Sequence, residues 1–538
     1  DNLEKLDYEE EKKLILIEKF KFIKPLSLKK DIKLFPHQEE GVAKLQNLYS
    51  IDEINGVLLA DDMGLGKTIQ ILIFLAWLKE KKGKEVYLKA LLVMPTSLIN
   101  NWNFQSDNPK EEGEIQKFFN KGTFKVRSFK GKLSDERIDD LNYSDIIITS
   151  YESLRLNHIK MGKINWSVIA CDESQKIKNP TTLVTTAIKT QNANFKIACS
   201  ATPIENTSED LWCLMDFVKP GLLGSLKDFK KEFSKPITNN QSKIEVIEEL
   251  NNNLKGKIDH FYIRRVKDVL NLDGSFPEKI ICYYNTLPSK IQDIKFQEII
   301  DESYDPGKIL GIIQKMLMIS SHPEIANGSD LISTDIKNLE KESSKINTLK
   351  KVLDEIKNKD EKVIIFTKYK KMQKIISILI NTWYKLSPSI INGDVNTEKR
   401  KEALDKFKQK KGFDIIVLSP EAAGVGLNIT EANHVIHYTR HWNPAKEEQA
   451  TDRVYRIGQK KDVYVHYPIL SYNKNYPEKV TYDLETWIEE ELNRSLEIST
   501  PEENLNYIIM KKKKMLKDFF LATPLDIDAS DFMGVMGK

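Results

Sequence analysis

Short apolar runs alternate with amphipathic, helix-like segments in two stretches of the chain. In the first stretch, residues 57–215, such runs occupy residues 90–94, 145–149, 166–171 and 196–199, and in the second, residues 362–466, they occupy residues 363–366, 414–418, 434–437 and 463–465. Near-continuous apolar, β-branched runs of this kind predict strands buried on both faces, as in a parallel sheet covered by helices. The pattern therefore predicts an α/β protein with two lobes, each built on a central parallel sheet.

The segment between the two stretches is rich in lysine and glutamate and has helical spacing. It predicts helices at residues 241–254 and 308–320, followed by a connecting loop at residues 333–344. Beyond the second stretch, residues 471–478 predict a surface loop, and the lysine run at residues 510–514 predicts a solvated helix face. The predicted domains are a helical extension (1–30), a first lobe (31–275) with a helical insertion (217–262), a helical insertion or linker (276–345), a second lobe (346–500) and a C-terminal helix or tail (501–538).

Composition narrows the class of protein. The chain has 538 residues, too many for one core, with 40% hydrophobic and 30% charged residues and a formal net charge of only +3. A nucleic-acid surface must therefore be a local patch. The four cysteines show no C-x-x-C spacing, which argues against a metal site or a disulfide framework and favours a reducing compartment. No apolar stretch has membrane-spanning length and no signal peptide is visible, so we expect a cytoplasmic protein without membrane contact.

The sequence from Leu58 to Thr68 predicts a strand, a phosphate-binding loop and the start of a helix. Glycines let backbone N–H groups surround a polyphosphate, and the helix N-terminus adds partial positive charge. Lys67 can reach the terminal phosphates, and the hydroxyl of Thr68 can hold Mg²⁺. A strict template of this loop would have glycine at Asp61, so a glycine-rich turn with a surface lysine is the alternative.

A second polar element follows the apolar run that ends at Cys171. Asp172 and Glu173 lie where the metal and the attacking water of a nucleotide hydrolase belong. Asp172 would hold Mg²⁺, and Glu173 would act as the general base. An ordinary helix N-terminus would show the same pair, so the pair alone leaves both readings open.

Further elements occur in an order that supports the hydrolase. Gln38 precedes the phosphate loop, where its amide could read an adenine edge, and Ser200 and Thr202 could hydrogen-bond to the acidic loop. In the second lobe, residues 449–456 predict the opening of a helix that carries Gln449, Arg453 and Arg456 on one face. The chain has only ten arginines, so this pair is not needed for solubility.

These motifs together resemble the superfamily 2 helicase-type ATPases, in particular the Swi/Snf branch of DNA translocases. The resemblance covers residues 31–495 and rests on short motifs in a fixed order: Q-element, DDMGLGKT, DESQ, SAT, GVGLN, HWNP and QATDRVYRIGQ. It implies two RecA-like lobes with helical insertions between them and a helical C-terminal segment. The Lys- and Asn-rich composition suggests a prokaryotic protein, and the start at Asp1 suggests that further domains or partner-binding segments precede it.

The resemblance implies ATP and Mg²⁺ as cofactors and double-stranded DNA as partner. Arg453 and Arg456 would be arginine fingers assisted by Gln449. The nucleotide would contact Gln38, Asp62, Met63, Gly64, Leu65, Gly66, Lys67, Thr68 and Gly426. By motif position, DNA-backbone contacts would come from Thr96, Ser97, Asn101, Thr149, Ser150, Lys368, Ser419, Asn428 and Trp442. Any of these could instead be a helix cap or a loop hydrogen bond, and Trp442 could only pack the lobe.

Two departures from the family pattern remain: Gln175 replaces the usual histidine after the acidic pair, and Arg440 is a charge without an explanation. Residues 263–267, by contrast, resemble the family's brace between the lobes, whose arginines would fix lobe geometry. Three alternatives for the function also remain. The function implied is an ATP-dependent translocase on duplex DNA. The alternatives are a strand-separating helicase, an RNA-directed ATPase, and a scaffold for which the nucleotide is only a switch.

Overall fold

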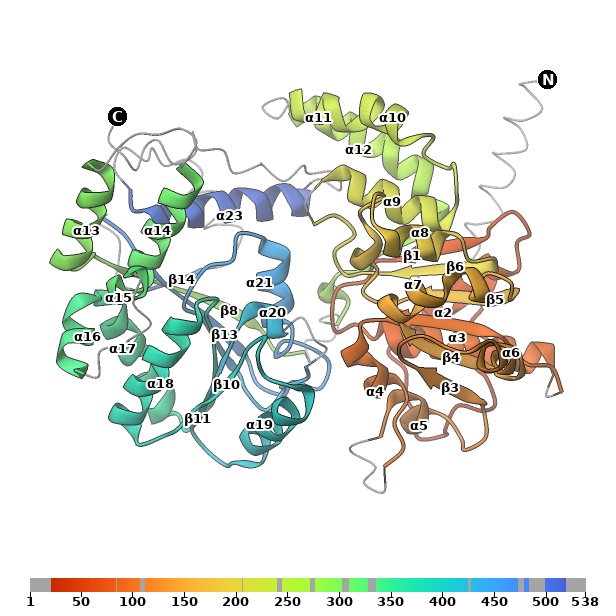
Figure 1. Cartoon of the computed structure of the whole chain (residues 1–538), viewed down its shortest axis with the longest axis horizontal. Coiled ribbons are helices and arrows are strands. Elements are labelled where there is room, and N and C mark those ends of the chain that lie inside the picture. The colour runs from red at the N-terminus through yellow and green to blue at the C-terminus, as the bar shows by residue number, and fades with distance from the viewer. Residues whose placement is uncertain are drawn as a thin grey trace. The chain divides into compact units, whose positions relative to one another are not determined.

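The chain divides into two units, each built around one sheet, with the division between Val269 and Leu270 (Figure 1). The computed structural model describes residues 21–83, 85–106, 112–205, 207–239, 244–270, 276–301, 309–327, 335–423, 427–472, 479–482 and 499–518. The predicted helical extension at residues 1–30 lies largely outside this range.

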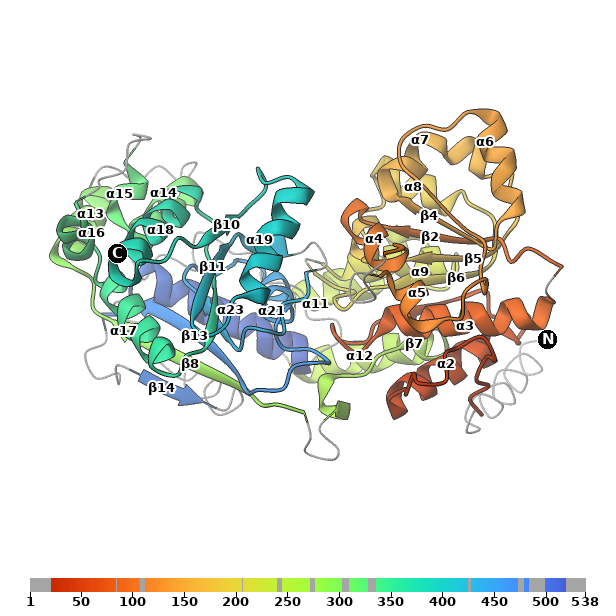
Figure 2. The same cartoon turned by 90° about the horizontal axis from the view of Figure 1, so that it is seen from below.

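The sheet of the first unit is parallel throughout, in the order β3-β4-β2-β5-β6-β1-β7. Its strands are β1 (Gly56–Leu59), β2 (Ala90–Met94), β3 (Val126–Phe129), β4 (Ile146–Ser150), β5 (Trp166–Cys171), β6 (Ala193–Cys199) and β7 (Tyr262–Ile263). Its helices are α2 (Pro36–Tyr49), α3 (Lys67–Lys82), α4 (Ile99–Trp102), α5 (Glu114–Phe118), α6 (Asp135–Asp139), α7 (Tyr151–Met161), α8 (Leu183–Lys189), α9 (Ser208–Val218), α10 (Leu226–Phe229), α11 (Lys235–Asn239) and α12 (Ile244–Ile258). Figure 2 shows α2 and α3 on one face of this sheet and α7 on the other.

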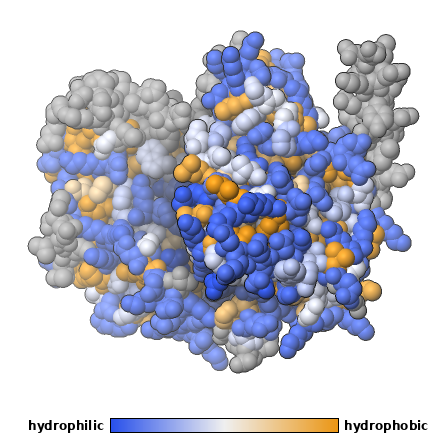
Figure 3. Space-filling model, turned by 45° about the vertical axis from the view of Figure 1, so that its right-hand side comes forward, coloured by the Kyte–Doolittle hydropathy of each residue, from blue (hydrophilic) through white to orange (hydrophobic). Residues whose placement is uncertain are grey.

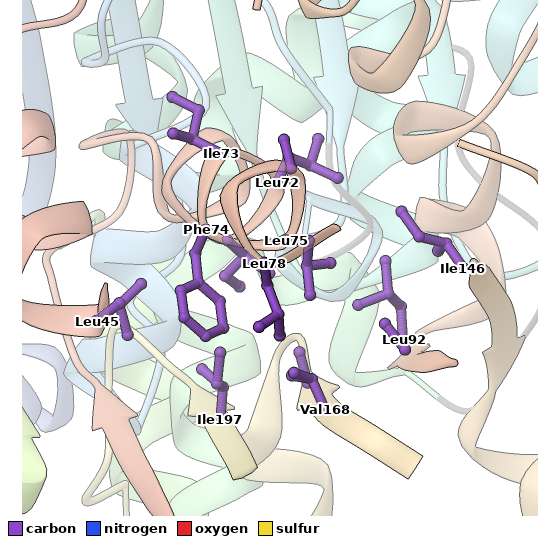
Figure 4. Packing of buried hydrophobic residues seen from close by; sticks show 14 of the residues in the cluster. Leu45, Leu72, Ile73, Phe74, Leu75, Leu78, Leu92, Ile146, Val168 and Ile197 are labelled. Atoms are coloured by element: carbon purple, nitrogen blue, oxygen red, sulfur yellow. The ribbon is translucent and has the colours of Figure 1, made fainter. Parts of the chain in front are cut away.

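Helix α3 forms the centre of the first core. Its residues 69–78 are all buried, so no solvated face is left on this part of the helix. Phe74 and Leu78 point toward Val168 and Ile197 of the sheet (Figure 4). Burying side chains of this size contributes about 1.5–3 kcal/mol each, so the core holds the start of α3, and with it Lys67, firmly against the sheet.

The second sheet has the order β10-β11-β9-β12-β13-β8-β14, and only its edge strand β14 is antiparallel. Its strands are β8 (Lys279–Thr286), β9 (Lys362–Phe366), β10 (Ser389–Ile391), β11 (Asp414–Leu418), β12 (His434–His437), β13 (Val463–Leu470) and β14 (Lys479–Tyr482). The helices of this unit are α13 (Lys290–Asp301), α14 (Ile309–Ser321), α15 (Pro323–Ala326), α16 (Ile336–Glu342), α17 (Ser344–Asn358), α18 (Lys370–Tyr384), α19 (Thr397–Gln409), α20 (Pro420–Ala423), α21 (Pro444–Thr451) and α23 (Pro501–Asp518).

Strand β9 shows why its run is apolar at every position. Val363 and Ile365 pack against side chains of α17 and α18 on one face of the sheet. Ile364 and Phe366 pack against α19 on the other face. The predicted fold class, two α/β lobes with parallel sheets and a helical C-terminal segment, is therefore confirmed.

Several local predictions need correction. Residues 276–345 contain β8, which pairs with β13 along its whole length, so this segment is not only helical. The Ile, Tyr and Thr residues of β8 favour a strand. The sequence around them is rich in lysine and glutamate, so the whole segment was predicted to be helical. The predicted loop at 333–344 contains α16. Helices α12 and α14 confirm the predictions at 241–254 and 308–320 within a few residues.

The described residues expose little apolar surface on the face drawn in Figure 3. Where residues are described, the face drawn in Figure 3 is mostly hydrophilic, with hydrophobic residues in small groups. Among the described helices, none combines the length and the apolar character needed to cross a bilayer. All four cysteines, Cys171, Cys199, Cys213 and Cys282, are buried free thiols.

Candidate functional site

The phosphate loop lies between β1 and α3, at the carboxyl edge of the first sheet. Gly64 and Gly66 have φ values of +89° and +83°, a region that residues with a Cβ rarely adopt. A Cβ on Gly66 would also lie only 2.5 Å from Nε2 of Gln38 on α2. Both the turn and the close approach of α2 therefore require glycine here.

Two side chains hold the loop from inside. The ammonium of Lys67 donates to the carbonyl oxygens of Asp61 at 2.6 Å and Asp62 at 3.2 Å. The amide of Gln38 donates to the carbonyl oxygen of Leu65 at 3.2 Å, and its Oε1 accepts from the backbone N–H of Phe35 at 3.1 Å. Gln38 thus ties α2 to the loop, and its role in reading adenine stays a prediction.

Asp61 is fully buried and forms an ion pair with Arg265. The guanidinium donates through Nε and Nη2 to the two carboxylate oxygens, at 3.0 and 2.5 Å, and the backbone N–H of Arg265 donates to Oδ1 at 3.0 Å. Gln70 of α3 donates to the same carboxylate at 3.1 Å and accepts from Arg265 at 2.7 Å. A carboxylate at this loop position is therefore the anchor for an arginine 204 residues away.

Asp172 follows β5 and lies close to the phosphate loop. Its carboxylate accepts from the indole N–H of Trp102 at 3.2 Å and from the backbone N–H of Glu173 at 3.0 Å. Burial and repulsion by Glu173 raise the pKa of Asp172 to about 6, while the charge of Lys67 opposes this rise. Lys67 and Asp172 therefore lie at the same carboxyl edge of the first sheet, and Trp102 is a partner that the sequence did not identify.

Glu173 belongs to a chain of hydrogen bonds between two strand ends. Its backbone is left-handed, with φ of +51°, and its carboxylate accepts from Nε2 of Gln175 at 2.7 Å. Oε1 of Gln175 in turn accepts from the hydroxyl of Ser200 at 3.0 Å, and this hydroxyl also accepts from the N–H of Thr202 at 3.1 Å. The predicted contact between residues 200–202 and the acidic loop is confirmed, and Gln175 is its link.

The oxygen ligands available here fit Mg²⁺. Thr68 stands in the first turn of α3 and offers a hydroxyl, and Asp172 offers a carboxylate at the same edge of the sheet. No described group of three or more His, Cys, Asp or Glu side chains could hold a metal alone. Mg²⁺ is commonly held by one or two protein oxygens together with substrate phosphates and water, and Thr68 and Asp172 offer oxygens of this kind.

The second unit corrects the predicted arginine helix. Helix α21 begins earlier, at Pro444, where Asn443 accepts from the N–H of Ala445 at 2.9 Å, and it ends at Thr451. Gln449 therefore lies in its last turn. Arg453 and Arg456 lie beyond its end, so the three residues do not share a helical face.

Tertiary contacts end this helix. The carbonyl oxygen of Arg453 accepts from the N–H of Ile429 at 3.0 Å, outside the helical pattern. Nε2 of Gln459 donates to the carbonyl oxygens of Thr430, Ala432 and Val454 at 2.9–3.3 Å and so fixes the following turn. Arg453 is buried and Arg456 is half-buried. Gly426 lies outside the described residues.

The candidate DNA contacts of the first unit fall into two groups. Thr96 and Asn101 are exposed, and Ser97 is partly exposed, in the turn and short helix after β2. Thr149 is fully buried and donates to the carbonyl oxygen of Phe129, and Ser150 caps α7 by accepting from the N–H of Ser153. Thr149 and Ser150 therefore make the internal hydrogen bonds that were expected if they are not DNA contacts.

The second unit shows the same division. Asn428 is exposed, whereas Ser419 is buried and caps α20 by accepting from the N–H of Ala422 at 3.2 Å. Trp442 is half-buried against an apolar cluster of α14 and α23 residues, and Nζ of Lys368 lies 5.9 Å from its ring centroid. Trp442 therefore packs the lobe; whether it also touches nucleic acid stays a prediction.

His437 gives the second unit a pH-dependent stability. The ring is buried between Phe366 and Tyr467 and hydrogen-bonds to Oγ1 of Thr451 at 2.8 Å. Burial lowers the pKa of His437 to about 4, so between pH 6.5 and 4 the unfolded chain binds the proton and the folded chain does not. We expect this residue to cost about 2 kcal/mol of unfolding free energy between pH 7 and pH 5. Urea denaturation at pH 7 and pH 5 should show that His437→Gln loses less unfolding free energy than the wild type. An equal loss in the two proteins would contradict the role assigned to His437.

Two family models match the chain. The SNF2-related domain matches residues 37–362, and the helicase conserved C-terminal domain matches residues 344–458. A Sulfolobus solfataricus SWI2/SNF2 ATPase core, solved in complex with dsDNA, is 29% identical, with 94% of this chain and 100% of that chain covered and a TM-score of 0.43.

Among curated proteins, the Zorya protein ZorD of Escherichia coli O139:H28 is 37% identical over 95% of this chain and 47% of its own length. The putative ATP-dependent helicase/translocase YwqA of Bacillus subtilis is 31% identical over 80% of this chain and 46% of its own. The chain thus spans about half the length of these relatives. Because the SNF2-related model covers more than half of the chain, and the phosphate loop, acidic pair and second helicase-like unit are all present, the chain belongs to the SNF2-related family of helicase-like ATPases.

Proposed function

We propose that this chain is a motor that hydrolyses ATP and uses the energy to move along double-stranded DNA. The observation that supports the proposal is the position of Lys67 and of the pair Asp172 and Glu173 after the parallel strands β1 and β5, at the same carboxyl edge of one sheet. A loop that binds phosphate and an acidic pair beside it are the two parts of a phosphoryl-transfer site. The ordinary helix N-terminus, the alternative for the acidic pair, would not need this proximity.

The site residues of the first unit each have a proposed role in this reaction. Lys67 would leave the carbonyl oxygens of the loop and bind the terminal phosphates of ATP. Thr68 and Asp172 would hold Mg²⁺, which neutralises phosphate charge. Glu173 would take the proton of the attacking water, and Gln175 would orient Glu173 through the bond at 2.7 Å.

Arg453 and Arg456 would complete the reaction from the second unit. A guanidinium that stabilises the charge of the transferred phosphoryl group contributes about 10³–10⁵ in rate. Because these arginines and the phosphate loop belong to different units, hydrolysis would require the units to come together during turnover. A polymer bound by both units would favour that meeting and so stimulate hydrolysis.

Duplex DNA is the polymer that we propose. Two relatives carry the names "Putative ATP-dependent helicase/translocase YwqA" and "DNA excision repair protein ERCC-6-like". The exposed candidates Thr96, Asn101 and Asn428 offer hydroxyl and amide groups, which suit phosphate contacts that carry no sequence information. Binding should therefore be unspecific in sequence and should weaken steeply with salt.

The test is the ATP hydrolysis rate with duplex DNA, single-stranded DNA and RNA, for wild type and Arg456→Ala. We expect duplex DNA to stimulate the wild type most and Arg456→Ala to remain near the unstimulated rate. Stronger stimulation by single strands or RNA would favour the strand-separating or RNA-directed alternative. The proposed motor function would be refuted if none of the three polymers raised the ATP hydrolysis rate, or if Arg456→Ala hydrolysed ATP at the wild-type rate.

A further inference from the structure

Arg440, the charge that the sequence left unexplained, lies in a buried ion pair. Its Nε and Nη2 donate to the two carboxylate oxygens of Glu447 at 3.0 and 2.9 Å, and the side chains are 1% and 0% exposed. The guanidinium also lies 4.3 Å from the ring centroid of Tyr467. Glu447 belongs to α21, so this pair attaches that helix to the end of β12.

Helix α23 contacts the same network at two points. Nη1 of Arg440 donates to Oδ1 of Asn506, and Nζ of Lys513 lies 2.8 Å from Glu448 and 3.5 Å from Glu447. Asn506 and Lys513 are seven residues apart, so both project from one face of the helix. Lys513 is therefore not part of a solvated face, which corrects the prediction for the run 510–514 at this position.

The rest of α23 is anchored elsewhere in the second unit. Glu502 forms a buried ion pair with Lys345 of α17 and accepts from the N–H of Leu470 at 3.0 Å. Leu505, Ile508 and Ile509 pack against α14. Because α23 is fixed independently of α21, it can serve as a reference for the position of α21.

The position of α21 matters because the arginines follow it at once. Glu447 and Glu448 directly precede Gln449, and the N–H of Arg453 donates to the carbonyl oxygen of Ala450 in the last turn at 3.3 Å. A displacement of α21 is therefore transmitted to Arg453 through one short turn.

We propose that Asn506 and Lys513 are positioning residues. Asn506 holds α21 through Arg440 and its partner Glu447, Lys513 holds it through Glu447 and Glu448, and together they place Arg453 and Arg456 for ATP hydrolysis. The inference rests on the role proposed above for these arginines. Stability alone gives little reason for the arrangement, because buried ion pairs are often no more stabilising than well-packed apolar side chains of the same size. A fixed geometry is what bidentate and multiply bonded charges provide.

The test uses the full chain with Lys513→Met and Asn506→Leu, which keep side-chain bulk and remove the polar contacts. Lys374→Met, at an exposed position of α18, is the matched control. We expect the duplex-stimulated kcat to fall between about tenfold and 100-fold in both variants, the cost of a small misplacement. The KM for ATP should stay within about twofold, because the phosphate loop is untouched. Lys513→Arg should restore most of the rate, and Lys374→Met should match the wild type.

Two comparisons separate this inference from the proposed function. Adding Lys513→Met to a variant that lacks both arginines, Arg453→Ala with Arg456→Ala, should cause no further loss, because the arginines to be placed are already absent. A loss that multiplies in this triple variant would overturn positioning, as would a kcat that falls only in proportion to the folded fraction by circular dichroism. If Lys513→Met and Asn506→Leu had normal rates while Arg456→Ala was defective, the positioning inference would be refuted and the proposed motor function would stand. A normal Arg456→Ala would instead refute the function.

Discussion

Glu173→Gln is expected to lower the ATP hydrolysis rate by about 10²–10⁴-fold, the usual contribution of a general base. Glutamine has the same shape, but it cannot take a proton from the attacking water. Its amide can still accept from Gln175, so the chain of bonds to Ser200 should persist. ATP should bind almost normally, because Lys67 and Thr68 are unchanged. Single-turnover hydrolysis and equilibrium binding of ATP measure the two effects separately.

Glu136→Gln is the control for this variant, since Glu136 is an exposed carboxylate at the start of α6. We expect it to hydrolyse ATP at the wild-type rate. If Glu173→Gln retained more than about a tenth of the wild-type rate, the general-base assignment would be refuted.

Arg265→Leu is expected to destabilise the first unit by about 3–5 kcal/mol, because it leaves the fully buried carboxylate of Asp61 without its cation. The variant should also loosen the phosphate loop, since the backbone of Asp61 is one of the two partners of Lys67. Thermal unfolding and the affinity for ATP are the measurements. Asp61→Asn combined with Arg265→Leu should recover part of the stability, because the uncompensated charge is then gone.

Arg127→Leu provides the comparison. Arg127 pairs with Asp140 at 3.2 Å, but both side chains are about half exposed, at 41% and 56%. Such a pair contributes about 0–1 kcal/mol. Equal losses of stability for Arg265→Leu and Arg127→Leu would mean that the buried pair does not anchor the loop.

The sequence was sufficient where one segment carried the whole signal. The strand at 90–94 is apolar at every position and the strand at 166–171 at all positions but Ser167, and the structure contains both with the same bounds. Lys67 and Thr68 were recognisable because their loop, glycines and helix start are contiguous. The acidic pair was recognisable for the same reason, at the end of one strand.

Prediction failed where a partner lies far along the chain. The sequence around Arg440 does not indicate that Asn506 is its partner, and the sequence around Asp61 does not indicate Arg265. Both pairs form only when the chain folds. The helix predicted across residues 449–456 failed because bonds to residues 429–432 end it, and local periodicity contains no information about them.

The four buried cysteines have a practical consequence for measuring motion. Burial raises the pKa of Cys171, Cys199 and Cys213, so few thiolates are present at neutral pH, and maleimide dyes should spare them. One new cysteine on α6 and another on α18 could then be labelled in an otherwise native background. Energy transfer between the two dyes would follow the distance between the units through each cycle of ATP binding and hydrolysis.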